Sequence, residues 1–68
     1  MDREVVVQGG GKNLYRVNES NGKYTAYRVD VGIISNSYSK IGEAHNLDDA
    51  LTLINNHAGR PVEKIKKW

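Results

Sequence analysis

The residues of this chain that could carry acid–base or nucleophilic chemistry are two histidines, a pair of aspartates and three serines. They are His45, His57, Asp48, Asp49, Ser35, Ser37 and Ser39. His45 precedes a helical segment and His57 lies near its end, which keeps the two rings well apart. Adjacent aspartates on a helix point about 100° apart and cannot clamp one metal ion. The serines have no evident base partner, so the sequence predicts no enzyme, no metal site and no cofactor.

A glycine-rich stretch raises a second possibility, a phosphate-binding loop. Gly9, Gly10 and Gly11 precede Lys12, and such loops can wrap backbone N–H groups around phosphate. Here Lys12 is followed by Asn13 and a predicted strand, not by Ser or Thr and a helix. The favoured interpretation is a flexible connector between strands.

One segment has a clear helical signature, residues 46–59. Asn46 suits the N-cap, and Gly59 suits the left-handed position after the last turn. Pro61 prevents continuation. The aliphatic side chains share one face, with Leu53 and His57 at its flank. That face holds Leu47, Ala50, Leu51, Ile54 and Ala58. We expect one amphipathic helix of about three turns that packs on a sheet.

The rest of the chain has β-strand composition. The predicted strands are residues 4–8, 13–19, 23–31 and 38–44, with 62–68 as a short final strand or an ordered tail. Residues 1–68 are thus predicted to form a single α+β domain. We expect a three- to four-stranded antiparallel sheet with one amphipathic helix on one face, a two-layer βββα arrangement with possible extra strands at both termini.

The hairpin between the second and third strands has two possible registers. A two-residue Asn21-Gly22 loop would pair odd with even positions and split the apolar sets of the two strands between opposite faces. A three-residue Ser20-Asn21-Gly22 loop pairs odd with odd. We therefore expect the longer loop, which places Tyr15 opposite Tyr27 and Val17 opposite Thr25.

In that register the even positions face away from the helix. They are Leu14, Arg16, Asn18, Tyr24, Ala26, Arg28, Asp30, Tyr38 and Lys40. Cations can neutralise phosphates and tyrosines can stack on bases, although open sheet faces also carry such residues for solubility. Lys64, Lys66 and Lys67 form a basic tail before Trp68, and this tail is either a phosphate-binding arm or a solvated terminus whose Trp covers the core.

Two segments are similar to a pattern in the DNA-binding domain of ethylene-response factors. They are 22–28, GKYTAYR, and 40–50, KIGEAHNLDDA. Related sheet-plus-helix domains occur in the N-terminal regions of phage integrases and homing endonucleases. The resemblance covers about residues 14–54. It implies three strands that contact DNA in the major groove, backed by the helix, with Arg16, Lys23, Arg28 and Lys40 as contacting residues.

These patterns favour a small binding domain whose partner is nucleic acid, most directly DNA. The expected contacts are Arg16, Lys23, Tyr24, Arg28, Tyr38, Lys40, Lys64, Lys66 and Lys67. The net charge of +2 is compatible with this partner without requiring it. The alternative is a protein-interaction module, for example a phage or mobile-element accessory protein that binds a partner through a sheet edge or a Tyr-bearing face.

The composition also limits the setting of the domain. The chain has no Cys, so neither disulfides nor thiolate metal sites are possible. Its N-terminus lacks the order of a signal peptide, and its apolar runs are too short to span a bilayer. We expect a cytoplasmic protein without membrane contact, as a monomer or a weak homodimer.

Overall fold

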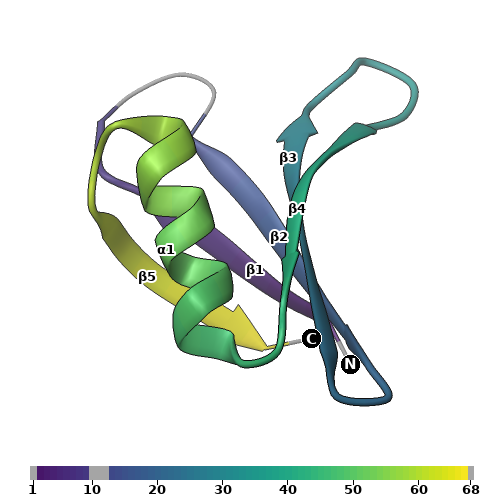
Figure 1. The fold of residues 1–68 in the computed structure, drawn as a ribbon. Helices are drawn as coiled ribbons and strands as arrows, with labels where there is room; N and C mark the ends of the chain where they lie inside the picture. The colour runs from purple at the N-terminus through teal and green to yellow at the C-terminus, as the bar shows by residue number, and fades with distance from the viewer. Residues whose placement is uncertain (1, 10–12, 68) are drawn as a thin grey trace.

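The computed structural model describes residues 2–9 and 13–67, which form a five-stranded antiparallel sheet crossed by one helix (Figure 1). In chain order the elements are β1 (Asp2–Val7), β2 (Leu14–Ser20), β3 (Lys23–Asp30), β4 (Ser37–Ala44), α1 (Leu47–Ala58) and β5 (Val62–Lys67). The strand order is β4-β3-β2-β1-β5. The α+β class is confirmed, and both terminal segments belong to the sheet. Residues 10–12 of the predicted connector and Trp68 lie outside the described residues.

Helix α1 begins and ends where the sequence predicts. The Asn46 side chain accepts a hydrogen bond from the Asp49 backbone N–H at 2.8 Å. Gly59 adopts a φ of 70° and donates its N–H to the Asn55 carbonyl at 2.9 Å, which closes the last turn. Within the described residues no helix is long and apolar enough to cross a membrane.

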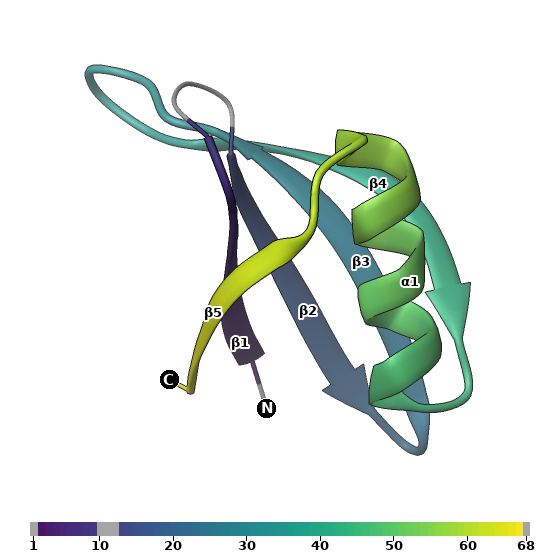
Figure 2. The same ribbon diagram turned by 90° about the vertical axis from the view of Figure 1, so that its left-hand side faces the viewer.

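The core lies between α1 and the sheet, and Figure 2 shows the helix over β3 and β4. Its fully buried side chains are Val5, Val7, Tyr15, Val17 and Ala26 from the sheet and Ala50 and Ile54 from the helix. The predicted apolar face of the helix is therefore the face that packs. Small residues on the sheet let the helix approach, because a Cβ on Gly42 would lie 3.0 Å from the Leu53 side chain.

The predicted register of the β2–β3 hairpin is wrong. Asn21 and Gly22 form a two-residue loop with φ of 54° and 76°. Two positive φ values match the right-handed twist of the flanking strands, which favours this loop over the longer one. Tyr15 consequently lies opposite Arg28, and Val17 opposite Ala26. Every side chain of β3 lies on the face opposite to the one expected.

The pairing of β3 with β4 shifts by one residue at a bulge. Ala26 pairs with Gly42, but Tyr27 pairs with Lys40, so Ile41 has no partner across the strands. Ile41 packs against the core, as the sequence predicts. Because of the extra residue, Lys40 and Glu43 lie on the same face of the sheet although they are three positions apart.

Candidate functional site: the outer face of the sheet

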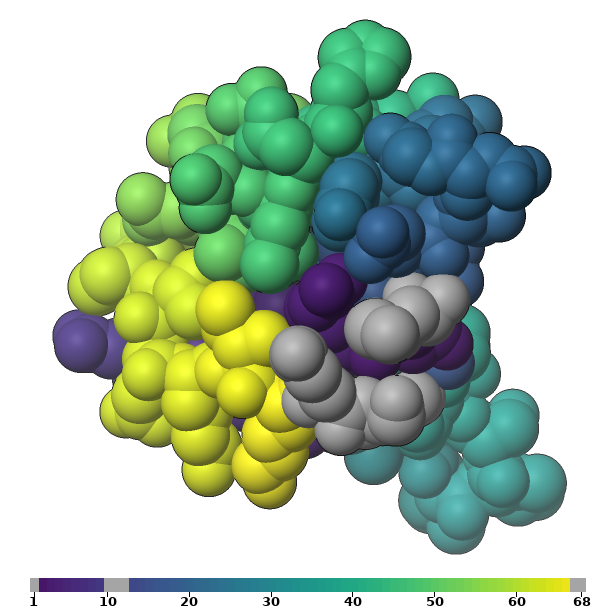
Figure 3. All heavy atoms as spheres, turned by 90° about the horizontal axis from the view of Figure 1, so that it is seen from below, coloured from purple at the N-terminus to yellow at the C-terminus, as the bar shows by residue number. Residues whose placement is uncertain are grey.

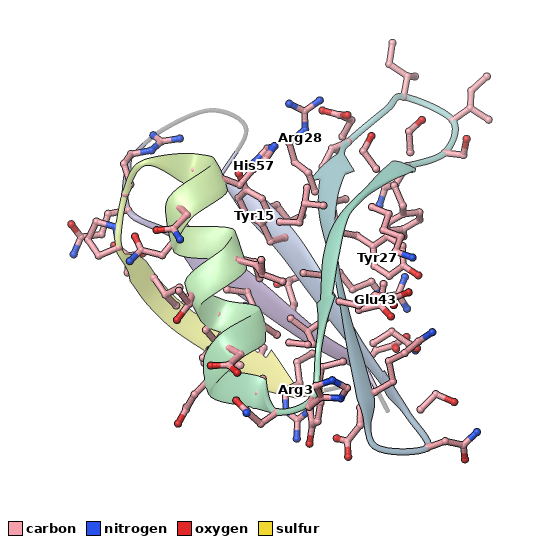
Figure 4. All side chains as sticks on the ribbon, in the orientation of Figure 1. Arg3, Tyr15, Tyr27, Arg28, Glu43 and His57 are labelled. Atoms are coloured by element: carbon pink, nitrogen blue, oxygen red, sulfur yellow. The ribbon has the colours of Figure 1, made fainter. Side chains whose placement is uncertain are left out.

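The sheet has a helix face, which packs against α1, and an outer face, which the helix leaves uncovered. Figure 4 shows Tyr15, Arg28 and Arg3 on the helix side and Tyr27 and Glu43 on the other. The register extends this assignment to the other strands, because residues directly opposite each other point to the same side. The polar and aromatic residues of the outer face are Asp2, Glu4, Arg16, Asn18, Ser20, Lys23, Thr25, Tyr27, Tyr38, Lys40, Glu43, Lys64 and Lys66.

One row of this face crosses all five strands. Its members, in the order β5 to β4, are Lys66, Glu4, Arg16, Tyr27 and Lys40, each directly opposite the next. The row therefore has a lysine at each end and an arginine beside a tyrosine near its middle. Neighbouring strands are about 4.8 Å apart, so the two lysines are separated by about four strand spacings.

Arg16 lies at the centre of a polar cluster. Its guanidinium donates to one oxygen of Asp2, and Asn18 donates to the other. The guanidinium carbon also lies 5.2 Å from the centre of the Tyr38 ring, a cation–π distance. The hydrogen bond from Asn18 and the charge and hydrogen bond of Arg16 lower the pKa of the Asp2 carboxyl. Asp2 is therefore a carboxylate at neutral pH.

A second cluster links β3 and β4. Glu43 accepts from Lys40 at 2.5 Å and lies 3.3 Å from the Lys23 ammonium. These contacts lower the pKa of Glu43, and the same hydrogen bond raises the pKa of Lys40. Both lysines are exposed, so the cluster is a solvated network on the surface.

A shallow hollow of about 360 Å³ lies on the outer face, around the Arg16 cluster. Its lining residues are Asp2, Arg16, Asn18, Tyr27 and Tyr38, from strands β1 to β4. Tyr38 lies opposite Val29, which is only 5% exposed, whereas the Tyr38 side chain itself stays 45% exposed. The hollow thus presents one carboxylate, two donor groups and two aromatic rings to the solvent.

Tyr24 and Arg28, two of the residues predicted to bind nucleic acid, lie on the helix face. Tyr24 packs against the core, and its hydroxyl donates a hydrogen bond to Glu19, which raises the pKa of Tyr24. The hydrogen bonds from Arg3 and Tyr24 lower the pKa of Glu19. Arg28 pairs with Asp30 at 3.0 Å. The prediction that these two side chains project from the outer face is wrong, because the hairpin register reverses β3.

The other predicted contacts are placed as follows. Arg16, Lys23, Tyr38 and Lys40 lie on the outer face, and the register puts Lys64 and Lys66 there too, next to β1. Within the described part of the chain, neither Lys64 nor Lys66 makes an ion pair. The side chain of Lys67 lies outside the described residues. The basic tail is therefore an edge strand of the sheet.

The loop between β3 and β4 is uncharged and carries apolar side chains in solvent. Ile33 and Ile34 are fully exposed, and Val31 is 71% exposed. Figure 1 shows the loop extending beyond the sheet, and Figure 3 shows its teal atoms projecting from the body of the molecule. An apolar segment in this position contributes nothing to the core.

The histidine and aspartates considered for chemistry have structural contacts. The His57 ring lies 3.0 Å from the hydroxyl of buried Tyr15 and meets its ring edge-on. Asp49 completes the helix cap through its backbone N–H and a contact from the Asn46 amide. Asp48 and Asp49 lie in the first turn, where the helix dipole favours negative charge.

Sequence reasoning missed Asp2, Tyr27 and Glu43 as members of the outer face. The Asn21-Gly22 dipeptide is the strongest short-range signal for a two-residue hairpin loop, and following it would have placed Tyr27 outward. Glu43 depends on the bulge and Asp2 on the pairing of β1, and neither has a comparable local signal.

Comparison of the chain with family models, with curated proteins and with solved structures finds no match. The resemblance to ethylene-response factors and phage integrases therefore stays a prediction.

Proposed function

We propose that this domain binds nucleic acid, without catalysis, on the outer face of its sheet. The observation that carries the proposal is the row from Lys66 to Lys40, which places cations at both ends of the face and Arg16 beside Tyr27 near its middle. Cations along a sheet can follow a phosphate backbone, and tyrosines between them can stack on bases.

The distribution of charge supports this choice of face. Among the described residues, the outer face has five cationic and three acidic side chains. Its cations are Arg16, Lys23, Lys40, Lys64 and Lys66, and its acids are Asp2, Glu4 and Glu43. Among the side chains that the structure describes, the helix and the sheet face beneath it carry two arginines and four acids, which are Arg3, Arg28, Glu19, Asp30, Asp48 and Asp49. The register shift in β5 assigns Glu63 to neither face. A polyanion is thus attracted to the outer side.

The carboxylates of the outer face do not cancel its capacity to bind phosphate. An ammonium has three N–H donors, so Lys40 can keep its contact with Glu43 and still donate to a phosphate oxygen. Lys64 and Lys66 make no ion pair within the described residues. If Lys40, Lys64 and Lys66 each contact one phosphate, the domain neutralises about three phosphates, so we infer a weak, salt-sensitive interaction.

An NMR titration with duplex and single-stranded oligonucleotides tests the proposal. Amides of β2, β3 and β4 should shift, and those on the exposed side of α1 should not. With three phosphate contacts, affinity should fall about 20- to 40-fold between about 50 and 200 mM salt. Absence of shifts with duplex, single-stranded DNA and RNA at the lower salt would refute nucleic-acid binding.

Variants of single cations identify the face. Lys40→Gln and Lys66→Gln should each weaken binding and reduce the salt slope by about 0.7 to 0.9. Arg28→Gln is the matched control, because it removes one positive charge from the helix face. Equal losses for Lys40→Gln and Arg28→Gln would mean that net charge, and not this face, governs binding.

The exposed β3–β4 loop favours a second candidate function, binding of a partner protein. Ile33 and Ile34 are fully exposed next to each other, and adjacent apolar side chains at a projecting tip suit a groove on another protein. Such binding would survive high salt. A pull-down at high salt, with this domain immobilised, tests this function. A protein that the native chain retains, and that the variant with Ile33→Ser and Ile34→Ser does not, would support it.

A further inference from the structure

The hollow on the outer face combines aromatic and polar groups in a way that restricts its ligand. Tyr27 and Tyr38 reach it from neighbouring strands, and Arg16 lies over the Tyr38 ring. Its volume of about 360 Å³ is at the small end of ligand sites in proteins. An occupant is therefore a single small ring system, flat enough to stack on a tyrosine.

The acidic group of the hollow excludes phosphate as the occupant. Asp2 is held by Arg16 and Asn18, one on each carboxylate oxygen. A phosphate at this point would be repelled by the carboxylate, whereas ring N–H and amino groups would find an acceptor there. Phosphates can bind instead to Lys40 and Lys66, which lie at the two ends of the row.

We propose that this hollow seats one unpaired nucleobase, so that the domain prefers single-stranded nucleic acid to duplex. The base would stack on Tyr38 or Tyr27 and use its edge on Asp2, Asn18 and Arg16. In a duplex both faces of a base are covered and its pairing edge is occupied, so it cannot enter. This inference rests on the proposed binding of nucleic acid by the outer face.

The test compares a single-stranded oligonucleotide of about ten mixed-sequence nucleotides with the same sequence as duplex, at one low salt concentration. We expect the single strand to bind about tenfold more tightly. A 2-aminopurine placed in the single strand should lose fluorescence when it stacks on the protein. Equal or tighter binding of the duplex would overturn the inference and leave the proposed function intact, whereas failure of both ligands to bind would overturn both.

Variants of Tyr38 separate stacking from folding. Tyr38→Leu keeps an apolar cover opposite Val29 but removes the ring, and should weaken single-strand binding about tenfold. Tyr38→Phe keeps the ring and should retain most of the affinity. Tyr24→Leu is the control, because that tyrosine lies on the helix face. If Tyr38→Leu binds single strands as the native chain does, or loses duplex binding equally, the hollow does not seat a base.

Discussion

The two faces of the sheet carry the same three kinds of side chain in different surroundings. On the helix face, Arg3 lies 3.1 Å from Glu19 and 5.9 Å from the centre of the Tyr24 ring. On the outer face, Arg16 pairs with Asp2 and lies over Tyr38. An arginine between a carboxylate and an aromatic ring is thus not by itself a sign of a binding site.

The difference lies in what covers each cluster. The Arg3 side chain is 12% exposed and its ring partner packs against the core. The Arg16 side chain is 23% exposed and its partner Tyr38 is 45% exposed beside the hollow. We infer that the first cluster closes one end of the core, and that the second is arranged around an opening on the surface.

The largest effect that separates the two faces is on folding. Ile54→Ala removes a fully buried side chain beneath the helix and should lower the free energy of unfolding by about 2–5 kcal/mol. Val29→Ala, on the outer face, should lower it by about 1–2 kcal/mol, because it removes two methyl groups from a side chain that is 5% exposed. Urea unfolding measures both values. A larger loss for Val29→Ala would show that the outer face contributes a core of its own.

Exchanging each arginine for methionine should separate stability from binding. Arg3→Met takes the guanidinium from Glu19 in a partly covered site, so the urea midpoint should fall while nucleic-acid affinity stays the same. Arg16→Met should weaken nucleic-acid binding about two- to tenfold. It should lower the urea midpoint less than Arg3→Met does. The reverse pattern, with binding lost in Arg3→Met and retained in Arg16→Met, would place the site on the helix face.

The smallest expected effect is a loss of folding stability at acid pH, to which one carboxyl on each face of the sheet should contribute. The pKa values of Asp2 on one face and Glu19 on the other are lower in the folded chain than their ordinary values. A carboxyl with a lowered pKa stabilises the fold above its unfolded pKa, and this contribution disappears as the pH falls through the folded pKa. The stability that these two carboxyls contribute should therefore be constant from neutral pH to about pH 5 and decline below about pH 4.5.

Urea midpoints of the native chain, Asp2→Asn and Glu19→Gln, measured across this pH range, show how much of the acid destabilisation comes from each carboxyl. Each variant should be less stable than the native chain at neutral pH, and the difference should shrink in acid. A difference that does not change with pH would mean that the carboxylate contacts of that face do not depend on ionisation.

Local signals accounted for the elements of the fold but not for the face of each residue. The helix bounds follow from Asn46 and Gly59, whose capping roles need only neighbouring backbone. The orientation of β3 was predicted from hydrophobicity, and that reasoning failed because Tyr27 and Val29 are partly or wholly covered on the outer face. Ala26 instead faces the helix, where a small side chain lets α1 approach.

The sequence by itself determined the α+β class, the helix with its caps and the set of cations available for binding. Those features depend on interactions between residues close in the chain. The Asn21-Gly22 dipeptide also contains the local signal for the hairpin register that puts Tyr27 beside Arg16. Only the tertiary structure decided that Glu43 joins Lys40 on the outer face and that Asp2 completes the hollow. These outcomes depend on the bulge at Ile41 and on the pairing of β1 with β2. Each is a long-range choice in which a shift of one residue reverses a face.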